Sequence, residues 1–161
     1  MRILLVRHAE AIGGAAVGSD HDRWLTDQGR RTMTTVGEML GRLDLRYSRI
    51  YTSPLVRAVQ TAEILALTQP GFDGPLQVHR ALSSNEGTTA RALAPIDDAG
   101  AEDLIVMVTH MPKIGVLAAH LGRLAHAPAF GTGSACLLSV DEGRGTIQWM
   151  LDPQTLELRR F

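Results

Sequence analysis

The chain has 161 residues, and its 16 lysines and arginines against 17 aspartates and glutamates give a formal net charge of −1. General nucleic-acid binders carry a basic excess, so this balance argues against nucleic acid as a partner. The length is that of one ordinary domain, and 45% apolar with 20% charged residues is a globular composition. We therefore expect a single domain over residues 1–161.

The N-terminus and the cysteine content bear on the cellular compartment. The first apolar run covers only Ile3 to Val6, which is too short for a signal peptide or a membrane span. Cys136 is the single cysteine, so neither an intrachain disulfide nor a cysteine-rich zinc site can form, and its apolar surroundings predict a buried, unreactive thiol. These features predict a cytoplasmic protein without a membrane partner.

The first half of the chain alternates short apolar runs with helical patterns. Residues 2–7 form a continuous apolar run of the kind that a parallel sheet buries on both faces. A loop rich in glycine and alanine follows over 11–20, and Thr26 then predicts the N-cap of a helix. Residues 49–52 predict a second strand. The Ser53–Pro54 pair predicts the next helix start, with the serine as cap and the proline as first helical residue.

The second half continues this alternation and ends differently. We expect a strand over 76–79, a helix over 88–94, a strand over 104–109, a helix that follows Pro112 and stops at Gly122, and a hairpin in which 136–140 and 146–151 flank a turn over 141–145. Alternating strands and helices indicate the α/β class. The predicted fold is a three-layer sandwich with a mostly parallel central sheet flanked by helices, an antiparallel hairpin near the C-terminus, and no cap domain.

Polar side chains stand directly after three of the predicted strands. Arg7 and His8 follow the first strand, and His110 follows the strand over 104–109. Ser53 follows the second strand, and Arg57 lies one turn into the next helix. The carboxyl ends of parallel strands meet at one edge of a sheet, where ligands bind in open α/β folds. Each residue alone has an ordinary structural explanation, but the joint arrangement indicates a site.

These residues suit phosphate chemistry. The planar guanidinium groups of Arg7 and Arg57 can bind phosphoryl oxygens in pairs. A neutral His8 can attack phosphorus if an acceptor holds its other ring nitrogen, and His110, if protonated, can donate to a phosphoryl oxygen. Arg23, in the loop above the predicted pocket, is a further candidate for substrate contact. This chemistry needs no metal and no cofactor.

Four segments, in the expected order, resemble motifs of the histidine phosphatase superfamily, also called the phosphoglycerate mutase-like superfamily. Leu4–Ala11 is similar to its Arg-His signature, and Tyr51–Ala62 is similar to its second signature. Leu25–Gly29 resembles the element that opens its first helix, and Val108–His110 resembles its later histidine motif. The matches extend across most of the chain, which is identified as a member of this superfamily.

The resemblance implies a role for each candidate residue. His8 would be the nucleophile that becomes phosphohistidine, Arg7 and Arg57 would clamp the phosphoryl oxygens, and His110 would be the second histidine of the pocket. The chain leaves no room for the inserted cap of the mutases. Its length and its Gly131–Ala135 segment are similar to phosphohistidine phosphatases of the SixA type. This type implies a hydrolase whose partner is a phosphohistidine-bearing protein, such as a histidine-phosphotransfer domain.

One departure from the family pattern leaves alternatives open. Many members place a glutamate after the third strand as general acid, and the corresponding stretch here is Leu82–Gly87. Glu86 is either that acid or a solvated loop carboxylate. A phosphoramidate needs a positioned acid less than an ester does, because solvent can protonate the departing imidazole at its other nitrogen. A phosphomonoesterase acting on a small phosphorylated metabolite, and a non-catalytic module that binds phosphoproteins, remain alternatives.

Overall fold

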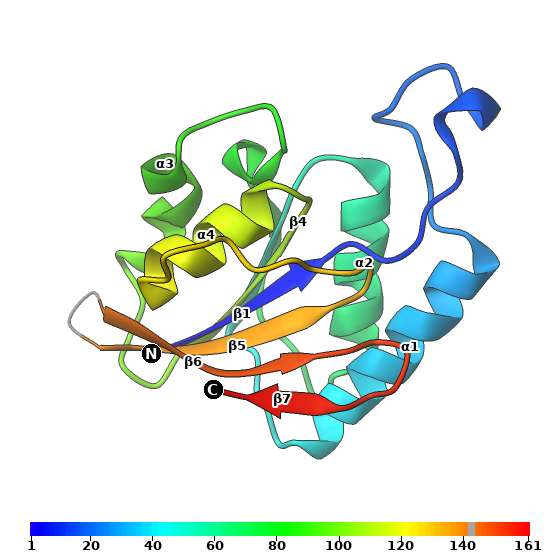
Figure 1. Ribbon diagram of the computed structural model, residues 1–161. Coiled ribbons are helices and arrows are strands. Elements are labelled where there is room, and N and C mark those ends of the chain that lie inside the picture. The colour runs from blue at the N-terminus through cyan, green and yellow to red at the C-terminus, as the bar shows by residue number, and fades with distance from the viewer. Residues whose placement is uncertain (142–143) are drawn as a thin grey trace.

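Seven segments form one sheet in the computed structural model, which describes residues 1–141 and 144–161. They are β1 (Arg2–Arg7), β2 (Arg49–Thr52), β3 (Leu76–Val78), β4 (Leu104–Thr109), β5 (Ala135–Asp141), β6 (Arg144–Leu151) and β7 (Leu158–Arg160). Their order across the sheet is β3-β2-β4-β1-β5-β6-β7 (Figure 1). β3, β2, β4 and β1 run parallel, whereas β5, β6 and β7 extend the sheet antiparallel. The sheet of the predicted α/β fold is therefore mixed.

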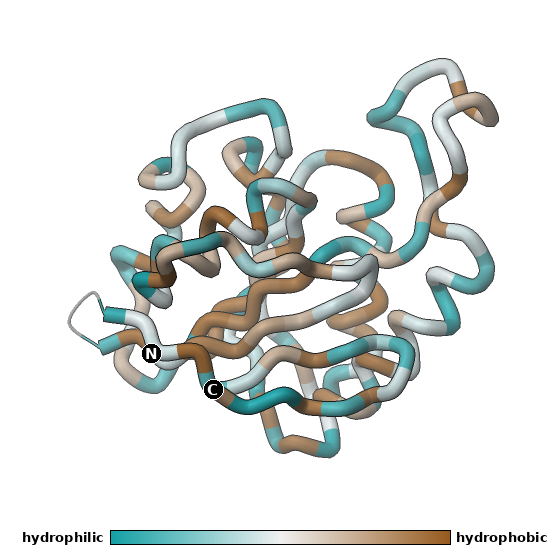
Figure 2. Tube along the Cα trace, viewed as in Figure 1, coloured by the Kyte–Doolittle hydropathy of each residue, from teal (hydrophilic) through white to brown (hydrophobic). Residues whose placement is uncertain are grey.

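Helices cover both faces of the sheet and produce the predicted three layers. They are α1 (Asp27–Arg42), α2 (Val56–Thr68), α3 (Thr89–Leu93) and α4 (Lys113–Gly122). Successive residues of β1 face opposite ways, so Leu4 packs into the core under α1 and α2, whereas Leu5 packs into the core under α3 and α4. Figure 2 shows the apolar residues concentrated along the central strands. The continuous apolar character of β1 and β4 follows from burial on both faces.

The start of α2 differs from the prediction. The helix begins at Val56, and its N-cap is Leu55, whose backbone is extended and whose side chain makes no capping hydrogen bond. Ser53 is therefore not the cap, and Pro54 is not the first helical residue. The physical reason is that the hydroxyl of Ser53 is hydrogen-bonded to His110, on another strand end.

The C-terminal part of the sheet also goes beyond the prediction. The hairpin strands are each longer than expected, and the predicted turn partly falls on 142–143, which lie outside the described residues. β7 was not predicted, because a three-residue segment with two arginines gives no alternating apolar signal. The expected stop of α4 at Gly122 is confirmed, with Arg123 taking the left-handed conformation after it. No helix of the described residues is long and apolar enough to cross a membrane.

Helix α1 is fastened to the segment that follows β1. Thr26 is its N-cap, as predicted, and the Thr26 hydroxyl accepts a hydrogen bond from the Gly29 N–H at 2.9 Å. The same hydroxyl donates to the Glu10 carboxylate at 2.6 Å. The chain leaves the sheet at the carboxyl end of β1, and the loop between Ala11 and Leu25, whose backbones pair at its base, projects away from the body (Figure 1). The start of α1 therefore holds the base of this projecting segment.

We expect Gly29→Ala to lower the free energy of unfolding by about 2–3 kcal/mol, because backbone must move to admit the methyl group. A Cβ at Gly29 would lie 2.1 Å from the Glu10 carbonyl oxygen. Gly41→Ala, in the same helix, is the matched control, since its Cβ would lie 3.3 Å from its nearest neighbour, Cδ of Pro70. Urea unfolding of both variants measures the difference. Equal losses would contradict this close approach.

Candidate active site

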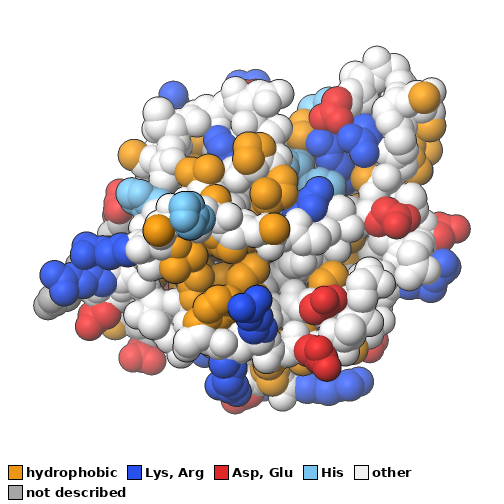
Figure 3. Space-filling model, in the orientation of Figure 1, with side chains coloured by type: hydrophobic (Ala, Val, Ile, Leu, Met, Phe, Trp, Pro, Cys, Tyr) orange, Lys and Arg blue, Asp and Glu red, His pale blue; other side chains and the backbone are white. Residues whose placement is uncertain are grey.

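The ends of β1 and β4 and the start of α2 bring the four predicted residues around one pocket of about 280 Å³. Arg7 ends β1 and His8 follows it, His110 follows β4, and Arg57 is the second residue of α2. Figure 3 shows histidine and basic side chains gathered in a hollow beside the projecting segment. The pocket is lined by Arg7, His8, Glu10, Ala11, Arg23, Arg57, Ser84, His110, Met111 and Thr132.

His8 is held as a neutral imidazole with one nitrogen free. Its side chain is buried, and its Nδ1 lies 2.7 Å from the Ala9 carbonyl oxygen. A carbonyl oxygen only accepts hydrogen bonds, so Nδ1 carries the proton and Nε2 keeps its lone pair. Burial and, to a smaller extent, the charges of Arg57 and Arg7 lower the pKa of His8 to about 4, although the hydrogen bond to Ala9 opposes this shift. Near neutral pH, His8 therefore has the form that a nucleophile requires.

His110 lies against His8, with their ring centroids 4.9 Å apart and the ring planes tilted by 50°. The His110 Nε2 is 2.7 Å from the Ser53 hydroxyl oxygen, whereas its buried Nδ1 has no hydrogen-bond partner among the described residues. Burial and, to a smaller extent, the charges of His8 and Arg57 lower the pKa of His110 to about 3. His110 is therefore neutral in the free protein near neutral pH, so it is not the protonated donor that the sequence allowed for.

The two arginines are each anchored at the tip of the guanidinium group. Arg57 donates from Nη1 to the Asp20 carbonyl oxygen at 2.7 Å and from Nη2 to the Asp20 carboxylate at 3.0 Å. Arg7 donates from Nη1 to the Phe130 carbonyl oxygen at 2.5 Å. In both side chains the Nε is buried and unpaired within the described part of the chain. The pocket therefore combines fixed guanidinium planes with N–H groups that lack acceptors.

Asp20 is a site residue that sequence reasoning missed. Its carboxylate bridges two arginines, because it also accepts from Arg23 Nη1 at 2.9 Å. Hydrogen bonds from Arg23 and Arg57 hold the pKa of Asp20 below its ordinary value. Arg23 also donates from Nε to the Ile12 carbonyl oxygen at 2.7 Å, and it lines the pocket. The i, i+3 spacing of Asp20 and Arg23 was the available signal, but an exposed pair of this kind is common in loops.

In the stretch Leu82–Gly87, where a general acid was considered, the residue that lines the pocket is Ser84 and not Glu86. Glu86 is exposed, its carboxylate lies 3.8 Å from Arg80 Nε, and it is absent from the pocket lining, where Ser84 stands instead. Lys113 holds this stretch in place by donating to the carbonyl oxygens of Ala81, at 2.8 Å, and of Glu86. Sequence reasoning missed Lys113, since nothing in a local pattern shows a lysine bonding to backbone from another element.

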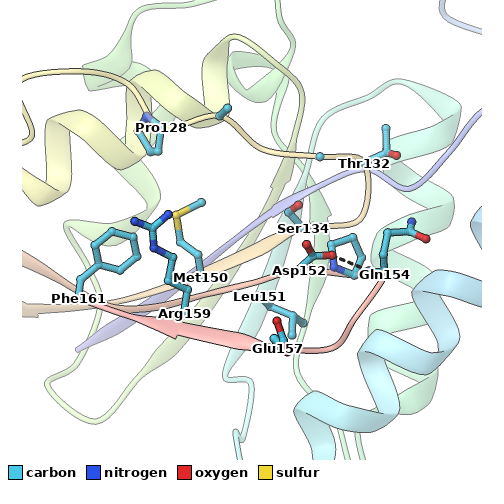
Figure 4. Close-up of a pocket in the computed structure, with 13 residues that line it drawn as sticks. Pro128, Thr132, Ser134, Met150, Leu151, Asp152, Gln154, Glu157, Arg159 and Phe161 are labelled. Carbon is cyan, nitrogen blue, oxygen red and sulfur yellow. Dashed lines mark hydrogen bonds between the residues drawn. The ribbon is translucent and has the colours of Figure 1, made fainter.

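A larger hollow of about 730 Å³ adjoins the pocket but lacks its chemistry (Figure 4). The two share Thr132. The larger hollow lies against β6 and β7, and its described lining contains one cation, Arg159, beside the carboxylates of Asp152 and Glu157. Negative charge on two side chains opposes the binding of an anionic phosphoryl group. The smaller pocket, which gathers three arginines and two histidines, is therefore the candidate active site.

The chain is similar in sequence and in fold to known proteins. The chain is 27% identical to the phosphohistidine phosphatase SixA of Escherichia coli, with 99% of each chain covered. It is 37% identical to an uncharacterized protein of Picosynechococcus over 81% of this chain and 74% of that protein. The solved structure of the protein histidine phosphatase SixA complexed with tungstate superposes with a TM-score of 0.86, at 25% identity, over 98% of this chain and 100% of that one.

A family profile covers more than half of the chain. The profile described as histidine phosphatase superfamily (branch 1) matches residues 3–86. This range includes Arg7, His8 and Arg57. The superposition on the SixA structure covers 98% of the chain and so includes the part of the fold beyond residue 86. The chain belongs to the histidine phosphatase superfamily.

Proposed function

We propose that this chain is a metal-independent phosphatase that removes the phosphoryl group from phosphohistidine of a protein through a covalent intermediate on His8. The observation that carries the proposal is one pocket that joins His8 and His110 with Arg7 and Arg57. Arg7 Nε, Arg57 Nε and His110 Nδ1 are three of the seven buried side-chain atoms that lack a hydrogen-bond partner among the described residues. Buried polar groups are nearly always hydrogen-bonded, and unpaired N–H donors on residues that line the pocket of His8 suit the binding of an anion. Residues 1–161 act here as one catalytic domain.

The first step transfers the phosphoryl group to the enzyme. His8 Nε2 attacks phosphorus while the bond from phosphorus to the substrate imidazole nitrogen breaks, and the bonding electrons leave with that nitrogen. Solvent protonates the leaving imidazole. Arg7 and Arg57 neutralise the phosphoryl oxygens, whose charge would otherwise oppose the attack. The Ala9 carbonyl stabilises the positive charge that develops on the His8 ring, because it accepts the Nδ1 proton at 2.7 Å.

The second step returns the enzyme to its starting state. A water molecule attacks phosphorus, the bond to His8 Nε2 breaks, and inorganic phosphate leaves. His8 Nε2 takes back its electron pair and remains unprotonated, since its pKa is about 4. The arginines contact the same oxygens in both steps, so one set of contacts serves two transition states.

The engagement of the nearby carboxyl groups favours cleavage of a phosphorus–nitrogen bond. Within the described residues, Glu86 is paired with Arg80, and the one pocket carboxylate, Glu10, accepts a hydrogen bond from Thr26. An alkoxide leaving group usually needs a positioned acid, whereas an imidazole leaves readily once solvent protonates it. The solved relative is complexed with tungstate, a tetrahedral oxyanion, which supports the binding of a phosphoryl group by a protein of this fold. The similarity to the phosphohistidine phosphatase SixA of E. coli supports a phosphohistidine-bearing protein as the partner.

A substrate comparison tests this proposal. Wild-type protein would be incubated with a phosphohistidine-bearing histidine-phosphotransfer domain and with a panel of phosphate monoesters, and phosphate release would be measured at equal substrate concentration. We expect kcat/KM to be highest for the phosphohistidine protein. Higher kcat/KM for a small ester would replace the proposal with a phosphomonoesterase that uses Glu10 as acid. Binding without turnover of any substrate would make the chain a phosphoprotein-binding module.

The pH profile gives an independent check on His8. We expect kcat/KM, corrected for ionisation of the substrate, to stay level from about pH 8 to about pH 5, because the pKa of His8 is about 4. A histidine with a pKa of 6.5 would instead lose about tenfold by pH 5.5. His8 and His110 bind protons at a higher pH in the unfolded chain than in the folded protein, so the free energy of unfolding decreases as the pH is lowered below about 6.5. Circular dichroism must therefore confirm the fold at each pH. A midpoint near 6.5 would contradict the neutral, buried His8.

A further inference from the structure

Ser53 is a buried polar residue whose position breaks a sequence rule. It stands at the end of β2, fully buried, with its N–H donating to the Val108 carbonyl oxygen at 3.0 Å. A serine followed by proline favours a helix start, but α2 begins only at Val56. Local rules of this kind fail most often where a side chain is used for function. The hydroxyl of Ser53 therefore has a task other than capping.

The hydrogen bonds of Ser53 determine which way its proton points. The described hydrogen bonds of its Oγ reach only two groups, the Leu55 backbone N–H at 3.4 Å and His110 Nε2 at 2.7 Å. The Leu55 N–H can only donate, so the Ser53 oxygen accepts there. The single O–H of Ser53 then has one acceptor within reach, which is the Nε2 lone pair of His110. This arrangement leaves Nε2 without a proton.

A consequence follows for the other nitrogen of His110. A neutral imidazole carries one proton, so an unprotonated Nε2 places that proton on Nδ1. Nδ1 is the buried nitrogen that has no partner among the described residues, and the ring of His110 lies 4.9 Å from the ring of His8. The opposite tautomer would present a lone pair there, which would repel the oxygens of a phosphoryl group. The tautomer therefore decides whether His110 attracts or repels the substrate.

We propose that Ser53 is a positioning residue that fixes His110 in the Nδ1–H tautomer and so gives the pocket a neutral hydrogen-bond donor toward the phosphoryl group. This inference rests on the proposed phosphatase function for its effect on catalysis, but its structural part stands on the hydrogen bonds alone. Burial lowers the pKa of His110 to about 3, so very little of the free protein carries a protonated His110 near neutral pH, and protonation cannot supply the Nδ1–H donor. A fixed tautomer supplies the donor near neutral pH.

The test compares three serine variants. Ser53→Ala removes the hydroxyl, Ser53→Thr keeps it, and Ser83→Ala is the matched control, because Ser83 is a buried serine with no hydrogen bond described for its hydroxyl. The ¹⁵N spectrum of the imidazoles, with His110 assigned by its loss in His110→Gln, reports which nitrogen is protonated. We expect Nδ1–H in the wild type, Ser53→Thr and Ser83→Ala, and a mixture with Nε2–H in Ser53→Ala.

Kinetics supply the second readout. Ser53→Ala should lower kcat by about tenfold to a hundredfold with KM changed little, because the lost donor acts on the transition state. Ser53→Thr should recover most of that loss. A protonated Nε2 in the wild type, or an unchanged tautomer in Ser53→Ala, would overturn the inference, and the wild-type spectrum alone decides it if Ser53→Ala does not fold. Failure of the wild type to turn over any substrate would overturn the proposed function and leave the tautomer result standing.

Discussion

His8→Ala is expected to lower kcat/KM for a phosphohistidine protein by at least about 10⁴-fold, because it removes the ring nitrogen that accepts the phosphoryl group in the proposed mechanism. Arg7 and Arg57 cannot act as nucleophiles since their guanidinium groups stay protonated, and His110 has its Nε2 occupied by Ser53. Binding of the substrate should persist, because the arginines remain. Steady-state phosphate release and equilibrium binding, measured on the same preparation, separate the two effects.

The control for this variant is an exposed histidine outside the pocket. His126→Ala removes the same side chain from a solvated position and should leave kcat/KM unchanged. If His8→Ala retained more than about a tenth of wild-type turnover, direct attack of water on the substrate would replace the two-step mechanism.

Arg57→Lys is expected to lower kcat/KM by about 10²-fold to 10³-fold, although the positive charge is kept. The Arg57 guanidinium uses one N–H of Nη1 and one N–H of Nη2 to hold Asp20, and its buried Nε has no partner in the described residues. A lysine ammonium cannot hold Asp20 with two parallel bonds and offer a further donor in the same plane. The projecting segment should also become more mobile, because it contains Asp20 and the two hydrogen bonds from Arg57 to Asp20 would be lost.

Arg46→Lys is the matched control for replacing a planar guanidinium group with a compact ammonium group. Arg46 is also paired with an aspartate, Asp44, at 3.0 Å, but both side chains are exposed and lie outside the pocket. We expect its kcat/KM to equal that of the wild type. Equal losses in the two variants would mean that arginine geometry in the pocket has no special role.

The sequence was sufficient for the fold class and for the residues that end its main strands. β1 and β4 are apolar throughout because helices cover both faces of the sheet, and such runs are visible without a structure. The parallel arrangement then places Arg7, His8 and His110 at one edge. Thr26 was predicted as a helix cap because capping depends on residues within one turn of each other.

The missed features depend on contacts between distant segments. Asp20 reaches Arg57 across 37 positions, and Lys113 reaches the carbonyl of Ala81 across 32, so neither pairing leaves a local pattern. The error at Ser53 has the same origin, since its partner His110 lies 57 positions away. Glu86 shows the reverse case, in which a suitable residue type stands near the expected position but its side chain lies beside Arg80.

The covalent step on His8 is the central claim, and trapping the phosphoenzyme tests it most directly. Wild-type protein would be mixed with a ³²P-labelled phosphohistidine protein, quenched on the millisecond scale, and digested for mass spectrometry. We predict label that is labile in acid and stable in base, located on the peptide that contains His8, and formed and lost at least as fast as kcat. Phosphate release without such label at any time, or label on another residue, would contradict the mechanism.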